Sequence, residues 1–458
     1  MHSNKNNHLK IISFGLVLGY STLVPLAAEA DEVNPMGYVR SQADKISDTT
    51  DGRLNISGYI NGHYMNHNGT PKLVGKDLDK PLFQMREASI FADFSLMDNL
   101  LFSTELETSY DFSSKSTSGR DDRFEALFNY YYFDYDVASS FDWDTDKYGS
   151  LSVRGGRILV PFLAYNENKP NFKQYLMSQP FTAQQLSPVN NAAISFQQYG
   201  WTDIGASVNW TYAFEDAGLF DLKLSIINGL GSESDALDAN SVQLSTSPTV
   251  RPRDGLYANK SDWNEFRDNN NDKAFVAKAS FSPFSVPLDI GVSYYNGAWD
   301  NDENNDLSMY GVHLNYSRKD WSLRGEYVQA DVEQTAGVNP VVQPGPASLN
   351  TTTGDYQMNS WYVEGSYVPF RYGENDNRYV RLVARYDDVD TNDKAAFTPF
   401  DRSRVTLGTE WGFIDNVRMR YEWQRHNIDS FENAPTPYVA AGGKEQINMQ
   451  MLSVIAYF

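Results

Sequence analysis

Six arginines near the C-terminal end of the chain recur at alternate positions within three neighbouring segments. They are Arg381 and Arg385, Arg402 and Arg404, and Arg418 and Arg420. A planar guanidinium binds a carboxylate or phosphate through two parallel hydrogen bonds, so arginines stacked on one surface can form a ladder for anions. If these segments are strands whose arginine-bearing face meets water, we expect the six side chains to line a passage for solutes.

Acidic residues on the same parity allow a second interpretation. Glu410 and Glu422 share the parity of the arginines, and Glu326 and Glu364 follow the same pattern further upstream. Arg418 with Glu422, and Arg324 with Glu326, could pair as salt bridges that hold the strands together. The sequence leaves both roles open. The other basic candidates for this surface are Arg154, Lys223 and Lys278, together with Lys169 and Lys173 in a long connecting segment.

The overall composition excludes several functional classes. The 458 residues include 38 Lys and Arg against 59 Asp and Glu, a formal charge of −21, so the chain is a poor partner for nucleic acid. There is no cysteine, which excludes disulfides, iron–sulfur clusters and cysteine-ligated zinc. We expect no metal and no cofactor. The hydrophobic fraction of 41% is enough for a folded protein.

The first thirty residues have the pattern of a secretory signal peptide. Lys5 and Lys10 precede a short apolar stretch over 11–24, and Ala28-Glu29-Ala30 matches a cleavage site. An uncleaved anchor is the alternative. Residues 31–53 are polar, and we expect a periplasmic extension, although a short helix that plugs a pore or pairs protomers is also open.

The remaining chain alternates apolar and polar residues with a period of two, which predicts strands. Val405, Leu407 and Thr409, for example, interleave with Arg404, Thr406 and Gly408. We expect sixteen strands, near 54–66, 84–96, 100–112, 123–136, 149–160, 203–213, 220–229, 273–282, 288–297, 307–318, 321–331, 356–368, 378–387, 402–413, 416–427 and 446–458. Most are longer than the five or six residues usual in soluble proteins and suit tilted strands that cross a bilayer.

The connections between these strands alternate in length. Residues 97–99, 319–320 and 414–415 make short turns, whereas 113–122, 332–355 and 428–445 are long. Short turns on one side, long loops on the other and an even strand count are typical of an outer-membrane β-barrel. Aromatic residues near strand ends match interfacial girdles, and a closed barrel leaves no unpaired edge in lipid. The fold class is therefore all-β, a transmembrane antiparallel barrel over 54–458 in a Gram-negative bacterium.

The sequence resembles the phosphate-selective porin O/P family of sixteen-stranded outer-membrane channels. Residues 153–162, with Arg154-Gly155-Gly156-Arg157 before Pro161-Phe162, resemble a strand that leads into the constriction loop of this family. Residues 84–90, residues 224–231 with Ile227-Asn228-Gly229, and the pair 382–387 and 404–411 resemble three further family segments. The terminal Phe458 resembles the signal that delivers such chains to the barrel-assembly machinery.

The resemblance implies that 161–202 folds into the barrel as a constriction loop, and that the protein is a homotrimer. An external flap is the alternative for 161–202. The expected function is passive diffusion of small hydrophilic solutes, including anions such as phosphate. The chain departs from that selectivity in its acidic loops, 268–272 and 300–303, and in its few lumen-facing lysines. The fold therefore transfers from the family more safely than the phosphate specificity.

Other functions were weighed against transport. Asp268, Asn270 and Asp272 begin like a calcium loop, but the Gly and the bidentate acid that complete one are missing, so a solvated loop or cation bridges to lipopolysaccharide fit better. A barrel hydrolase needs a histidine with a paired nucleophile. His313 and His426 face the lumen without one in the sequence, so we expect no enzyme. A surface receptor, adhesin or structural barrel remains an alternative.

Overall fold

The computed structural model describes residues 50–68, 82–111, 123–141, 143–183, 200–232, 256–257, 270–300, 303–333, 355–373, 377–390, 393, 402–428 and 446–458. The predicted signal peptide (1–30) and most of the predicted extension (31–53) lie outside these residues. Among the described residues, no helix is both long and apolar enough to cross a membrane.

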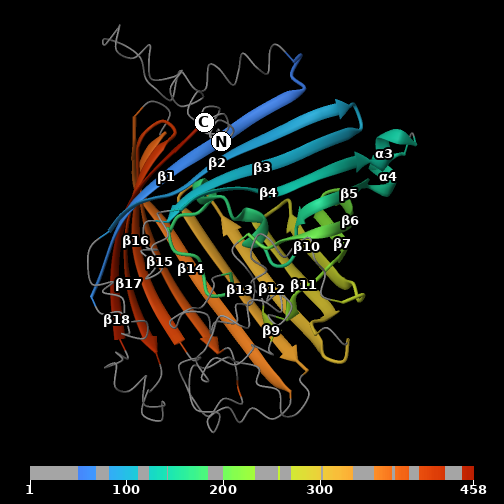
Figure 1. Ribbon diagram of the computed structural model, residues 1–458. Coiled ribbons are helices and arrows are strands. Elements are labelled where there is room, and N and C mark those ends of the chain that lie inside the picture. Colours follow the sequence, from blue (N-terminus) through green and yellow to red (C-terminus); the bar gives the residue numbers. More distant parts are fainter. Residues whose placement is uncertain are drawn as a thin grey trace, which may run out of the picture.

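Sixteen antiparallel strands form one closed barrel (Figure 1). Its first half contains β1 (Leu54–Asn68), β2 (Leu82–Met97), β3 (Leu100–Asp111), β4 (Arg123–Asp136), β5 (Ser150–Leu159), β6 (Thr202–Phe214), β7 (Gly218–Ile227) and β10 (Ala274–Pro283). Its second half contains β11 (Leu288–Ala298), β12 (Asp306–Ser317), β13 (Trp321–Val332), β14 (Tyr356–Tyr372), β15 (Arg378–Asp390), β16 (Arg402–Ile414), β17 (Val417–Ile428) and β18 (Gln446–Tyr457). The ring closes where β1 pairs with β18. Each barrel strand otherwise pairs with the next barrel strand in the chain, so that β7 pairs with β10 across the separate segment that contains β8 (Gly231–Ser232) and β9 (Leu256–Tyr257).

The predicted number and order of barrel strands are confirmed, and most boundaries agree within two residues. The largest difference is in β14, which continues past Pro369 to Tyr372, beyond the predicted end at 368. The pairing of β14 with β15 shifts register between Tyr367 and Phe370. A proline has no N–H for the ladder, and a bulge is one of the few places where a strand tolerates it.

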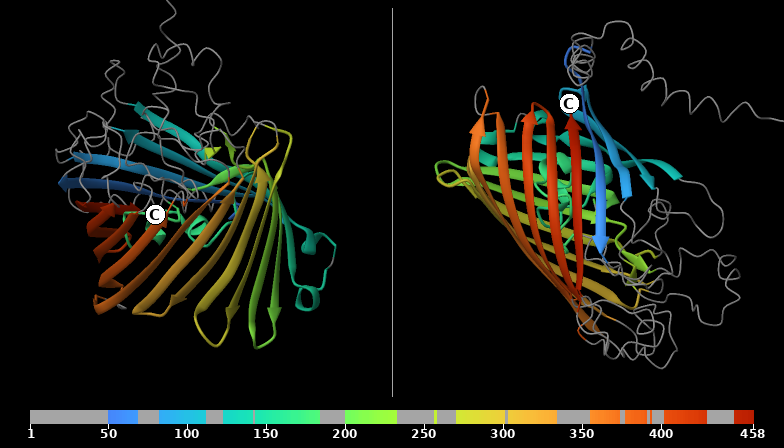
Figure 2. Two further views of the ribbon diagram at one scale, coloured as in Figure 1. Left: turned by 90° about the horizontal axis from the view of Figure 1, so that it is seen from below. Right: turned by 90° about the vertical axis from the view of Figure 1, so that its left-hand side faces the viewer.

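Short pieces of structure lie outside the barrel wall. The connection between β4 and β5 contains α3 (Val137–Ser140) and α4 (Thr145–Tyr148), which project from one side of the barrel in Figures 1 and 2. Asp136 and Asp144 cap these helices by accepting hydrogen bonds from Ser139 N and Lys147 N. A separate two-stranded sheet pairs β8 (Gly231–Ser232) with β9 (Leu256–Tyr257).

The two faces of the wall differ as the alternation predicts. Outward side chains are large and apolar, such as Val292 on β11, Val312 on β12 and Val363 on β14, and each is about half exposed. Inward side chains on the same strands include Ser293, His313 and Glu364, which are buried. An apolar outer face and a polar inner face are the arrangement that a barrel needs to sit in lipid and enclose water.

The segment after β5 folds into the barrel. In Figure 1 residues 161–183, which include η2 (Asn166–Asn168) and η3 (Asn171–Lys173), run inside the ring of strands. Phe162, Leu163 and Phe181 are fully buried among inward residues of the wall such as Val276 and Val328. Residues 161–183 are called the inner loop below. Residues 184–199 of the predicted constriction loop lie outside the described part of the chain.

Candidate functional site

The candidate site is the space between the inner loop and the barrel wall, and Glu326 on β13 holds the loop at both of its ends. One carboxylate oxygen accepts hydrogen bonds from Ala164 N at 2.9 Å and Tyr165 N at 2.7 Å. The other accepts one from Thr182 Oγ1 at 2.9 Å. Glu326 is 4% exposed, so these three bonds form away from bulk solvent. A single side chain therefore fixes the start and the end of the inner loop.

The middle of the inner loop is held by Glu422 and Arg385. Glu422 on β17 accepts hydrogen bonds from Met177 N at 2.7 Å and Ser178 N at 3.2 Å. Arg385 on β15 donates to the Ser178 carbonyl at 2.9 Å and to the Gln179 carbonyl at 3.2 Å. Backbone N–H and C=O groups in a loop lack the partners that a neighbouring strand supplies in a sheet. Glu422 and Arg385 provide hydrogen-bond partners for these loop groups instead.

The C-terminal arginines meet the loop and the acids at the same time. Arg404 donates to the Gln179 carbonyl, Arg418 to the Phe172 carbonyl at 2.8 Å, and Arg420 to the Gln174 carbonyl. Asp387 lies between the Nε atoms of Arg385 and Arg404, 3.0 Å from each. The structure therefore brings Arg385, Arg404, Arg418 and Arg420 to the inner loop, and all four position it.

Glu410 on β16 sits beneath three guanidinium groups. Its carboxylate is 2.8 Å from Arg420, 3.7 Å from Arg381 and 3.8 Å from Arg418. The Glu410 side chain is fully buried, whereas those of Arg381 and Arg418 are 13% and 21% exposed. The carboxylate thus lies behind the cations with respect to the lumen.

Tyr175 of the inner loop is stacked between two arginines. The guanidinium carbons of Arg324 and Arg381 are each 3.9 Å from the centre of its ring. Burial opposes ionisation of the Tyr175 hydroxyl, but the two cations outweigh it and lower the pKa of this group. Arg324 is 20% exposed and lies 3.9 Å from Glu364, whose side chain is 6% exposed. The same layering therefore recurs, with the cation toward the lumen and the acid behind it.

Lys173 and Arg402 complete the predicted basic residues of this side. Lys173 ends η3 and is exposed, and Arg324 reaches its carbonyl at 3.5 Å. Arg402 begins β16 at the end of the strand farthest from the short turn at 415–416, and is half-buried. The structure therefore brings Lys173 to the arginines of β13, β15 and β17, and places Arg402 apart, near the opposite rim.

The inner loop also reaches the far wall of the barrel. Lys169 Nζ lies 3.1 Å from Glu105 Oε2 on β3, and both side chains are almost fully buried. In the ring of sixteen strands, β3 is eight strands away from β13, which carries Glu326. The loop is therefore tied to opposite sides of the barrel and crosses the lumen.

A further ion-pair group lies beside the inner loop at η2. Glu167 pairs with Lys223 on β7 and Lys278 on β10, and Lys278 also donates to the Leu163 carbonyl at 2.9 Å. Arg154 on β5 pairs with Asp134 on β4 at 2.6 Å and covers the ring of Tyr132. These predicted lumen residues do face inward, and each is matched by a carboxylate.

The Glu167 ion pairs predict a specific dependence on pH. Burial raises the pKa of this carboxyl, but Lys278 and Lys223 outweigh burial and hold it at about 2, against an ordinary value of 4.5. A lowered folded-state pKa means that the contribution to stability is complete above about pH 4.5 and is lost as the pH falls toward about 2. We expect Glu167→Gln to reduce the loss of melting temperature over this range, measured by thermal unfolding in detergent. An unchanged acid profile would show that the pairs do not contribute.

Sequence reasoning missed two acids that organise this site. Asp387 shares the parity of Arg385 two residues away, a signal that was available in the sequence. Glu105 lies among alternating residues on β3, but its partner Lys169 is 64 positions away in a loop. Such long-range pairs depend on how the loop crosses the barrel, which the local pattern does not define.

The acidic loops show another use for their carboxylates. Asp272 accepts a hydrogen bond from Ala298 N at 2.8 Å, and Glu303 accepts one from Asn271 N at 2.7 Å. Asp300 accepts from Asn304 N and Asn305 N. These bonds tie neighbouring loops together. Within the described residues no group of three or more acids or histidines is placed to hold a metal ion, and Asp268 lies outside them.

Comparison with known proteins supports the predicted resemblance. A family model described as phosphate-selective porin O and P matches residues 255–450. Of the segments that carried the resemblance, only 382–387 and 404–411 fall inside this match. A search of curated protein sequences finds no significant match.

Solved structures of outer-membrane channels share the fold. Salmonella typhi OmpF, in a complex with daunomycin, is 11% identical with a TM-score of 0.50, and the match covers 89% of this chain and 99% of that one. The outer-membrane channel DcaP of Acinetobacter baumannii is 12% identical, with a TM-score of 0.49 and coverage of 88% and 97%. An anion-selective porin from Comamonas acidovorans is 11% identical, with a TM-score of 0.46 and coverage of 88% and 99%. The predicted barrel fold is confirmed.

Proposed function

We propose that this chain is an outer-membrane porin that passes small hydrophilic anions through a constriction formed by the inner loop and the arginines. Residues 255–450 match the phosphate-selective porins O and P, and the described strands form a closed barrel. Solutes move down their gradient, and pore width and lining charge set the selection. The inner loop, and with it the predicted segment 161–202, is the constriction in this proposal.

One observation carries the anion preference, namely the layering of charge at the arginines. Lys173, Arg324, Arg381 and Arg418 are exposed or partly exposed, whereas the paired acids Glu364 and Glu410 are buried behind them. A passing solute therefore meets the cations first. Field from fixed cations in a narrow, low-dielectric site attracts anions and repels cations.

The remaining arginines have a different role in this proposal. Arg385, Arg404 and Arg420 are 3%, 0% and 1% exposed, and they bind loop carbonyls and carboxylates. A guanidinium that is buried behind the inner loop is out of reach of a passing anion. We assign these three residues to holding the loop. The salt bridges differ from the predicted ones, because Arg418 pairs with Glu410 instead of Glu422 and Arg324 pairs with Glu364 instead of Glu326.

The proposal is tested by the charge of Lys173. Lys173→Glu changes the lumen charge by two units, which at roughly 7 Å in water amounts to about 1.2 kcal/mol for a monovalent ion. We expect the chloride-to-potassium permeability ratio to fall several-fold, measured as the reversal potential of a planar bilayer under a salt gradient. Lys147→Glu, on α4 outside the barrel, is the control and leaves the ratio unchanged. Equal ratios in all three proteins would contradict the anion preference.

The proposal disfavours a hydrolase and a surface receptor. A serine hydrolase needs its hydroxyl bonded to the histidine, with the acid on the other side. Here Asp289 lies between Ser282 and His313, 3.2 Å and 3.1 Å from them, so the order is wrong. We therefore propose transport without catalysis. Discrete conductance steps would separate a channel from an adhesin or structural barrel.

The assembly partners complete the proposal. We propose a homotrimer in the outer membrane, in contact with its lipid and lipopolysaccharide, and delivery to the barrel-assembly machinery through Phe458. The Phe458 backbone N–H donates to the Gly58 carbonyl at 3.0 Å, so the last residue is already part of the ring closure. Chemical crosslinking in intact outer membranes tests the trimer.

A further inference from the structure

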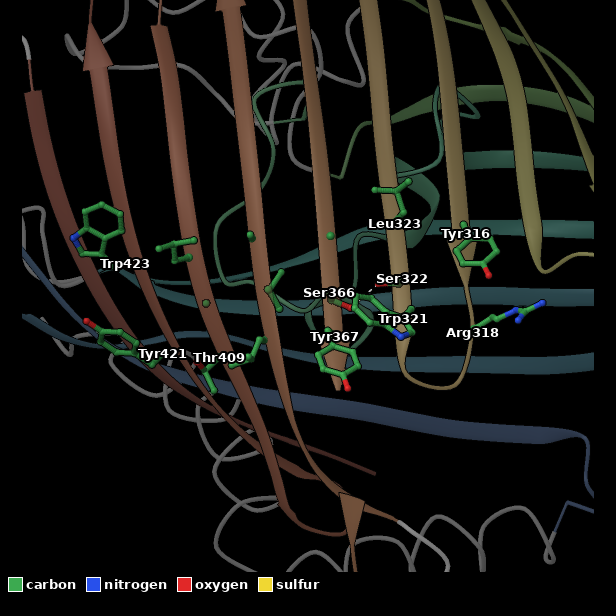
Figure 3. Close-up of a pocket in the computed structure, with 16 residues that line it drawn as sticks. Tyr316, Arg318, Trp321, Ser322, Leu323, Ser366, Tyr367, Thr409, Tyr421 and Trp423 are labelled. Carbon is green, nitrogen blue, oxygen red and sulfur yellow. Dashed lines mark hydrogen bonds between the residues drawn. The ribbon is translucent and has the colours of Figure 1, made fainter. Parts of the chain in front are cut away.

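A depression of about 1050 Å³ opens on the outer face of the barrel, over β12 to β17. Figure 3 shows Tyr421 and Trp423 on one side of it and Tyr316 and Trp321 on the other. Small and aliphatic outward residues, such as Gly365, Ala384 and Leu407, lie between them, with Tyr367 near the mouth. This depression is called the outer groove.

The register of the strands explains why the groove exists. One transverse row of outward residues runs across six paired strands in the order Tyr316, Leu323, Gly365, Ala384, Leu407 and Trp423. Its two central members have the smallest side chains. Because neighbouring strands are about 4.8 Å apart, the missing side chains leave a gap roughly 10 Å wide between large ones.

Gly365 is not required by the packing of the barrel. A Cβ atom placed on it would meet no other atom within 4 Å, in contrast to Gly205, where a Cβ would overlap the backbone of β7. Glycine weakens a strand interior, and one of the places where it occurs in strands is a site of close approach by a ligand. The groove is therefore a feature that the fold itself does not need.

The mouth of the groove lies at the end of the barrel with short turns, which faces the periplasm in outer-membrane barrels. Trp321, the first residue of β13, stacks on Tyr367 with ring centres 4.1 Å apart. Arg318, in the turn before Trp321, is exposed, and among the described residues its side chain forms no ion pair. Figure 3 shows this side chain directed away from the groove at its rim. Aromatic rings and a cation at this depth match the polar boundary of a membrane.

We propose that the outer groove binds one glycerophospholipid of the periplasmic leaflet. An acyl chain lies over Gly365 and Ala384 between Leu323 and Leu407. The ester region contacts Trp321 and Tyr367, and the phosphate is neutralised by Arg318. The apolar gap and the cation at its mouth complement the two ends of such a lipid.

A second copy of the chain fits the groove less well. An apolar projection that a second copy could offer is the α3–α4 connection, where Phe141 is 72% exposed. It lies between β4 and β5, and β5 is eight strands from β15 in either direction around the ring. Contacts between opposite faces build an open row instead of a closed trimer. Lipid A also fits less well, because it lies in the outer leaflet whereas the mouth of the groove lies at the periplasmic end of the barrel.

Native mass spectrometry tests the site. Full-length protein is purified in detergent, stripped of lipid and mixed with phosphatidylglycerol or phosphatidylethanolamine. We expect one phospholipid per protomer. Gly365→Leu and Ala384→Leu each fill the gap and lower the retained fraction about tenfold, the effect of roughly two buried methylenes. Arg318→Ala also lowers retention.

The control is Gly155→Leu on β5. Gly155 pairs with the outward Phe133, and a Cβ there also meets no atom within 4 Å. We expect this variant to retain lipid as the unaltered protein does. Equal losses in the Gly155 and Gly365 variants, no stoichiometric phospholipid, or an adduct with the mass of lipid A would each overturn the proposal. So would a change in oligomeric mass on filling the groove, because that places a second copy there.

Discussion

Channels with Glu326→Ala are expected to conduct more current than the unaltered protein, by roughly twofold or more, because the narrowest part of a pore limits its conductance. The substitution leaves Ala164 N, Tyr165 N and Thr182 Oγ1 without their shared acceptor in a buried place. Each unsatisfied buried donor costs about 1–3 kcal/mol. The free energy of the loop then falls when it moves into water, because water satisfies these donors. Single-channel recordings in planar bilayers measure the increase.

The matched control for this prediction is Glu326→Gln. The glutamine keeps one carbonyl oxygen that can accept from Ala164 N and Tyr165 N, so we expect a conductance close to that of the unaltered protein. If Glu326→Ala conducts like Glu326→Gln, the inner loop does not form the narrowest part of the pore.

Asp387→Ala is expected to destabilise the barrel by about 3–5 kcal/mol, the usual cost of removing one partner from a buried ion pair. Asp387 is fully buried and accepts from Arg385 and Arg404 at 3.0 Å each, and from Phe181 N at 3.1 Å. The substitution leaves two neighbouring buried cations without the carboxylate between them. The melting temperature in detergent, followed by circular dichroism, measures the loss.

Asp388→Ala is the control, since Asp388 is the next residue on β15 and lies on the opposite face of the strand. We expect its melting temperature to stay near that of the unaltered protein. Similar values for the two variants would mean that Arg385 and Arg404 find other partners, and that the buried cluster is not a main source of stability.

The wall of the barrel could be predicted from sequence because its signals are local. Alternation with a period of two defines which residues form a strand, and short turns such as 415–416 define where neighbouring strands separate. The clearest boundary difference is in β14, where a register shift between Tyr367 and Phe370 accommodates Pro369 and the strand continues beyond it.

The contacts of the site could be predicted only in part. The parity of Arg385 and Arg420 correctly placed them inside the barrel. Their partners are backbone carbonyls of the inner loop, such as Ser178 and Gln174, which no side-chain pattern reveals. The outer groove has the same origin, because Gly365 and Ala384 become neighbours only through the register of two strands.

The pairing of β1 with β18 has a consequence for how the protein is made. Tyr59 and Tyr457 are partners in the ring although nearly the whole chain separates them. Contacts between residues so far apart in the chain carry a large entropic cost and form slowly. Until the last strand arrives, β17 and β1 each present an open edge, which hydrocarbon does not tolerate. The barrel is therefore complete only when β18 pairs with both neighbours, and a chain that lacks β18 has two open edges in the bilayer.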